Sequence, residues 1–145
     1  MKVLLINPKF PDTYWSFSHA LPFEGKRSAF PPLGLLTVSA LLPFSWERRL
    51  VDMNVESLKA SHIDWADMIF ITAMLVQKDS LRQVAQLCKA KGKRVVLGGP
   101  YVTTTVEDLP IEALNGLLGM CAVDELHECE PARAPRFTID RQHHL

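Results

Sequence analysis

The sequence lacks the features that mark membrane-spanning, secreted and disulfide-bonded proteins. Its longest apolar run, residues 33–42, is too short to cross a bilayer. The apolar start at residues 1–6 is too brief for a signal peptide, because Asn7-Pro8 interrupts it. Three cysteines without regular spacing argue against a disulfide framework. Reduced thiols and a cytoplasmic location are therefore expected.

An excess of either charge is also missing. Sixteen Lys and Arg residues balance sixteen Asp and Glu residues. Nucleic acids and anionic membranes are bound by clustered positive charge, so we expect neither as a partner. The chain has 145 residues, 48% of them hydrophobic, which is enough to form one domain with a core of its own.

Common phosphate-binding and nucleophile motifs do not occur. There is no Gly-x-Gly-x-x-Gly, no Gly-Lys followed by Ser or Thr, and no nucleophile-elbow spacing. The first apolar run ends in Asn7, where a receiver domain would carry clustered acids. The loop at residues 7–11 also lacks the hydroxyl-rich and glycine-rich composition of a flavodoxin phosphate loop. Hydrolase and nucleotide-binding functions have little support.

The strongest positive signal is the apolar run that ends in two glycines. Residues 93–97 lead from a basic start through Val95, Val96 and Leu97 to Gly98-Gly99-Pro100. This pattern predicts a buried parallel strand whose carboxyl end is sterically bare. Glycine is favoured where the chain takes a positive φ, or where a ligand or another backbone approaches closely.

Strands are expected to alternate with helices along the chain. Apolar runs predict strands at residues 2–6, 46–53, 68–71 and 93–97, and candidate strands at 117–120 and 136–140. Helices are expected at residues 31–42, within 55–63, from an Asp79-Ser80 cap to Gly92, and after a cap at Thr103, Thr104 or Thr105. This alternation is typical of an α/β fold with a doubly wound parallel sheet, flavodoxin-like or Rossmann-like, of order 2-1-3-4-5.

The pattern weakens near residue 115. We interpret residues 1–115 as one α/β domain and residues 116–145 as an atypical, partly disordered tail, so the fifth strand is the weakest element. A sheet without that strand would have an open edge that favours self-association. No standard zinc spacing occurs among the tail's metal-ligating side chains, which are Cys121, His127, Cys129, His143 and His144. We therefore expect no metal site there.

The expected strand order brings the ends of three strands together. These ends carry Asn7 and Pro8, then Thr72, Ala73 and Met74, then Gly98, Gly99 and Pro100. Ligands of open parallel sheets bind at this edge. The long aromatic and proline-rich segment at residues 8–31 is either a lid over the protein's own core or a cover over a bound ligand.

Four segments together carry a resemblance to a known family. They are residues 1–11, 30–36, 51–54 and 95–101, in this order and spacing. They resemble the N-terminal cobalamin-binding domain of cobalamin-dependent radical S-adenosylmethionine enzymes, in the branch of the hopanoid methylases. The resemblance implies that cobalamin lies over the carboxyl edge of the sheet, with its nucleotide tail between the sheet and the helices. The candidate cofactor-binding residues are Asn7, Pro8, Thr72, Ala73, Met74, Gly98, Gly99, Pro100, Tyr101 and Thr103.

The sequence departs from this family in two ways. In place of Asp-x-His-x-x-Gly it has Tyr14 and Phe17 after Asp12, so we expect base-off cobalamin without a histidine lower ligand. The Cys-x-x-x-Cys-x-x-Cys motif of the iron–sulfur cluster is absent. We therefore expect no catalytic residue and no iron–sulfur cluster in this chain, which resembles such a protein truncated before its radical domain. The partner would be a radical S-adenosylmethionine catalytic domain or subunit.

Two alternatives remain open. One is a non-catalytic remnant or protein-interaction module that keeps the fold without binding cobalamin. The other is an enzyme or carrier that uses a different small ligand at the same edge. One fold hosts many functions, so the sheet order does not choose among them.

Overall fold

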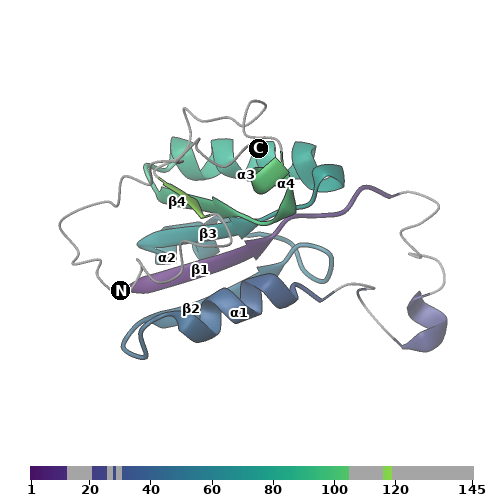
Figure 1. The fold of residues 1–145 in the computed structure, drawn as a ribbon, viewed down its shortest axis with the longest axis horizontal. Helices are drawn as coiled ribbons and strands as arrows, with labels where there is room; N and C mark the ends of the chain where they lie inside the picture. Colours follow the sequence, from purple (N-terminus) through teal and green to yellow (C-terminus); the bar gives the residue numbers. More distant parts are fainter. Residues whose placement is uncertain (13–20, 26–27, 29–30, 105–115, 119–145) are drawn as a thin grey trace, which may run out of the picture.

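A five-stranded parallel sheet forms the centre of the molecule (Figure 1). The computed structural model describes residues 1–12, 21–25, 28, 31–104 and 116–118. The strands follow the order β2-β1-β3-β4-β5, and every neighbouring pair is parallel. Their bounds are β1 Lys2–Asn7, β2 Glu47–Asp52, β3 Met68–Thr72, β4 Arg94–Gly98 and β5 Gly116–Leu118. The predicted α/β fold and its strand order are confirmed.

The burial of each strand explains its place in the sheet. β1 pairs on both sides and is buried from Val3 to Asn7, as expected for a strand covered on both faces. β2 forms one edge of the sheet, and only Val51 in it is buried. Its charged start, residues 47–49, suits an edge because charged side chains discourage pairing with another chain.

Helices cover both faces of the sheet (Figure 1). The longer ones are α1 Leu33–Leu41 and α3 Lys78–Ala90, which lie on opposite sides, and the shorter ones are α2 Ala60–Trp65, α4 Pro100–Thr104 and the 3₁₀ turns η2 Leu21–Glu24 and η3 Leu75–Gln77. Side chains alternate between the faces of a strand, so Leu4 and Ile6 belong to the core with α3 while Val3 and Leu5 pack with α1. The sheet thus separates two apolar cores.

One predicted helix start is wrong, and two of the three predicted caps of another helix are excluded. α3 begins at Lys78 after η3, and its N-terminus has no side-chain cap, because Ser80 Oγ instead accepts a hydrogen bond from the Lys9 N–H. α4 begins directly after Gly99, so Thr103 and Thr104 lie inside this helix and do not cap a following one. The third candidate cap, Thr105, lies outside the described residues. At α3 a tertiary contact overrides the local capping signal.

The candidate fifth strand is present at Gly116–Leu118, where it pairs with β4. The division at residue 115 stays a prediction. Several other predictions fall outside the described residues. They concern the candidate strand at 136–140, the cap at Thr105, and the cysteines and histidines of the tail. Much of the segment at residues 8–31 also lies outside them. Within the described part of the chain, no helix is long and apolar enough to cross a membrane.

The buried thiol of Cys88 gives stability a pH dependence. Cys88 is fully buried on α3, and burial raises its pKa to about 11, against the opposing effect of the Lys93 charge. Between pH 9 and 11 the unfolded thiol ionises while the folded one keeps its proton, so stability falls as pH rises. We expect urea unfolding of the wild type to lose roughly 2 kcal/mol more than Cys88→Ala over this interval. Parallel pH profiles for the two proteins would contradict this.

Candidate functional site

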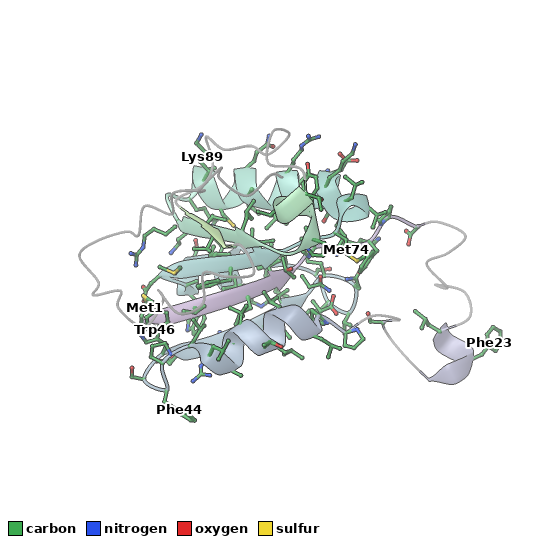
Figure 2. All side chains as sticks on the ribbon, viewed as in Figure 1. Met1, Phe23, Phe44, Trp46, Met74 and Lys89 are labelled. Atoms are coloured by element: carbon green, nitrogen blue, oxygen red, sulfur yellow. The ribbon has the colours of Figure 1, made fainter. Side chains whose placement is uncertain are left out.

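The carboxyl edge of the sheet, meaning the ends of β1 to β4 and the loops after them, gathers most of the predicted site residues. The register places Asn7 beside Asp52 and Thr72 beside Gly98. Met74 projects at this end of the molecule, away from Met1 and Trp46 at the opposite end (Figure 2). The sequence prediction that the ends of β1, β3 and β4 converge agrees with this arrangement.

The diglycine turn packs directly against the end of β3. Gly99 has a φ of 94°, and a Cβ there would collide with Thr72 Oγ1 and lie 3.0 Å from the Ala73 carbonyl oxygen. The Ala73 N–H donates to Gly98 O at 3.2 Å, and the Tyr101 N–H donates to Ala73 O at 3.1 Å. Glycine is required at position 99 for both conformation and space. The turn consequently presents backbone and no side chain.

Three consecutive apolar side chains stand beside this turn. Met74, Leu75 and Val76 are 50%, 57% and 58% exposed, and we call them the apolar rim. They follow β3 through η3, and the next residue, Gln77, is buried. Single exposed apolar residues are ordinary, but a contiguous group at a ligand-binding edge is typical of an interaction site.

Four polar side chains form a hydrogen-bonded chain under the edge. We call Asn7, Asp52, Asn54 and Gln77 the amide network. Asp52 Oδ1 accepts from Asn7 Nδ2 at 3.1 Å, from Asn54 Nδ2 at 2.7 Å and from the Asn54 N–H at 3.0 Å. Gln77 Nε2 donates to Asn7 Oδ1 at 3.2 Å. Asn7 and Gln77 are 4% and 2% exposed, so both ends of the Asn7 amide are engaged inside the protein.

Sequence reasoning did not assign a role to Asn54 or Gln77. Asn54 Oδ1 accepts from the Phe10 N–H at 2.8 Å, and Gln77 Nε2 donates to Pro8 O at 2.6 Å. A polar pair just after an edge strand, Asp52-x-Asn54, is the one local signal that could have indicated the first of them. Gln77 carries no such signal.

Other predicted residues have different surroundings. Pro8 is buried and Pro100 is exposed at the start of α4, in which Thr103 also lies. Among the five histidines of the sequence, His62 is within the described residues, and its Nδ1 accepts from the Lys59 N–H at 3.4 Å. No group of three potential metal ligands forms in the described part of the chain.

The Tyr101 hydroxyl is buried and has no hydrogen-bond partner among the described residues. Tyr101 is 1% exposed and belongs to the core with α3. Burying an unpaired hydroxyl costs free energy, so we expect Tyr101→Phe to raise the unfolding free energy of the ligand-free protein by about 1 kcal/mol. Urea unfolding measures this, with Tyr101→Leu as a control that removes the ring and is expected to destabilise. A loss of stability in Tyr101→Phe would show that the hydroxyl is paired in solution.

Comparison with known proteins relates the chain to methylases. No family model matches the chain. Over 125 residues, 86% of the chain, it is 41% identical to a protein of Synechocystis named as an uncharacterised methyltransferase. Over 110 residues, 75% of the chain, it is 31% identical to the hopanoid C-2 methylase of Rhodopseudomonas palustris. The chain is related to methylases.

The match covers a limited part of these relatives. The chain spans 23% of the length of the first and 21% of the second. The relationship therefore supports a methylase-related protein, and one of the two relatives is named as a hopanoid methylase. The activity of these complete proteins is therefore attributed to this chain only as a proposal.

Proposed function

We propose that this chain is the cobalamin-binding domain of a methylase-related protein and that it holds cobalamin over its carboxyl edge. The observation that carries the proposal is the combination of a side-chain-free diglycine turn with the apolar rim. A corrin ring is broad and flat. Two glycines add no side chain between the backbone of the turn and a ring laid on it, and apolar groups at the margin exclude water from the contact. The Cβ position of Gly99 itself faces Thr72 and Ala73, so this glycine acts by letting the turn close onto the end of β3.

The residues of the edge suit the cofactor's chemistry. Gly98, Gly99 and Pro100 would lie against the ring, and Met74 with Ala73 would pack at its margin. The Thr72 hydroxyl and the backbone groups of this edge are of the chemical type that could hydrogen-bond the amide side chains of the corrin ring. Thr103 stays a candidate contact through its place on α4.

Tyr101 offers a second point of attachment. Its hydroxyl has no partner in the described part of the core between the sheet and α3, where a polar group of an inserted nucleotide tail could accept from it. Asn7 and Pro8 act in this proposal through the amide network, because their polar atoms bond to other residues of the chain.

Catalysis is assigned elsewhere in this proposal. A bound cobalamin supplies a cobalt centre that can carry a methyl group. The iron–sulfur motif of the radical enzymes is absent from the 145 residues, so a radical S-adenosylmethionine domain or subunit would be the partner that carries out the reaction. Cobalamin would bind base-off, without an imidazole of this chain below the cobalt.

The test is retention of the cofactor. Purified protein is incubated with hydroxocobalamin, desalted, and examined by visible absorbance. We expect near-stoichiometric corrinoid on the wild type. Gly92→Ala should retain the corrinoid, because a Cβ at position 92 meets nothing within 4 Å. Gly99→Ala should lose it, because a Cβ there would collide with Thr72 Oγ1. The His62→Ala variant should leave the spectrum unchanged. A colourless, folded wild type would overturn the proposal and favour an interaction module of the same fold.

A further inference from the structure

We infer that Asn7 and Gln77 are positioning residues that hold the apolar rim in place for ligand binding. The ligand in this inference is the cobalamin of the proposed function, on which it rests. The structural part, that the amide network sets the conformation of the rim, stands on the contacts of the ligand-free chain.

Gln77 ties the rim to the end of β1. Its Oε1 accepts from the Met74 N–H at 2.8 Å, and the Gln77 N–H donates to Met74 O at 2.9 Å, so the two residues close the turn that displays the rim. On its other side, Nε2 donates to Pro8 O and to Asn7 Oδ1. The two bonds of Nε2 are buried and the bond to the Met74 N–H is partly buried, and a buried hydrogen bond is stronger and its loss more costly than in water.

The orientation of each amide is set from Asp52. A carboxylate only accepts, so the Asn7 amide must turn its NH₂ toward Asp52 and its oxygen toward Gln77. That oxygen in turn requires the Gln77 NH₂, which leaves Gln77 Oε1 facing the Met74 N–H. The Asp52 carboxylate on β2 and the Pro8 carbonyl, which also accepts from Gln77 Nε2, thus both require the same orientation of the Gln77 amide.

The other loops are fastened to the same point. Asn54 donates twice to Asp52 Oδ1 and accepts from the Phe10 N–H, which joins the loop after β2 to the loop after β1. Three strand ends are therefore connected through one carboxylate. A reversed amide anywhere in this chain would place two donors or two acceptors together.

The rim needs such support because water opposes its exposure. Met74, Leu75 and Val76 would lower their free energy by collapsing onto neighbouring apolar surface. A fixed turn keeps them open, and a site that is already in its binding conformation loses less entropy when the ligand binds. This makes the network a determinant of affinity as well as of stability.

The first test compares Gln77 of η3 with Gln86 of α3. Gln77→Leu removes the three side-chain bonds, whereas Gln86→Leu changes an exposed residue of α3. For Gln77→Leu we expect about tenfold faster hydrogen exchange at the Met74 amide without ligand, and about tenfold weaker binding of hydroxocobalamin. Gln86→Leu should change neither.

A second test exchanges charge and amide between two strands. Asn7→Asp places two carboxylates together and should weaken hydroxocobalamin binding, while the double variant Asn7→Asp/Asp52→Asn restores one acid and one amide and should recover most of the affinity. The comparison isolates the coupling between the two positions. It also remains informative if Gln77→Leu fails to fold.

The outcomes separate the inference from the proposed function. A wild type that does not bind hydroxocobalamin defeats the proposed function, and the ligand-dependent inference with it, whatever the Met74 amide does. If the wild type binds, unchanged exchange at Met74 in Gln77→Leu overturns the inference. Faster exchange with unchanged affinity also overturns it, because the network would then be structural only.

Discussion

Gly99→Val is expected to destabilise the protein by about 4 kcal/mol, from a strained φ and a steric clash together. A β-branched residue at a φ of 94° is strongly disfavoured, and its Cβ would collide with Thr72 Oγ1 and crowd the Ala73 backbone. Small domains have only about 5–15 kcal/mol of stability, so the variant should unfold at much lower urea.

The matched control is Gly92→Val. Gly92 also has a positive φ, 64°, but a Cβ there meets nothing within 4 Å. It should therefore show the conformational cost alone, about 1–2 kcal/mol. Equal destabilisation by the two substitutions would mean that the diglycine turn does not pack on β3 as described.

Asp52→Ala is expected to cost about 3 kcal/mol, because three donors lose one charged acceptor. The Asn7 amide is the most affected, since it is buried and would keep an unsatisfied NH₂. The two Asn54 donors are less buried and can turn to water. Urea unfolding at neutral pH gives the free-energy difference.

Two substitutions calibrate this value. Asp67→Ala removes an exposed carboxylate that accepts from the Lys2 N–H, and it should cost less than about 1 kcal/mol. Asp52→Asn keeps an acceptor oxygen and should be milder than Asp52→Ala. If Asp52→Ala costs no more than Asp67→Ala, the amide network does not contribute to stability as its geometry implies.

The architecture was predictable because it depends on short-range patterns. β1 is an apolar run that ends in Asn7 before Pro8, and β3 and β4 are apolar runs that end in Thr72 and Gly98. Their alternation with helices indicates a parallel sheet. The diglycine signal was also informative, since a positive φ and a close approach both occur at Gly99. The approaching group is Thr72 of the neighbouring strand, which a local pattern could not identify.

The amide network was not predictable because its partners are far apart in sequence. Gln77 and Asn7 are separated by 70 positions, and Asn7 and Asp52 by 45. Asn7 was expected at the cofactor because it ends a strand, but sequence position alone does not show which way an amide points. The start of α3 was misjudged for a similar reason, because Ser80 bonds to the distant Lys9.

The central claim is that the carboxyl edge of the sheet binds cobalamin, and hydrogen exchange with and without hydroxocobalamin tests it most directly. We expect the cofactor to slow exchange at residues 72–76 and 98–101, and to leave residues 47–49 and the start of β4 unchanged. Protection confined to the opposite end of the sheet, or no protection at saturating cofactor, would contradict the claim.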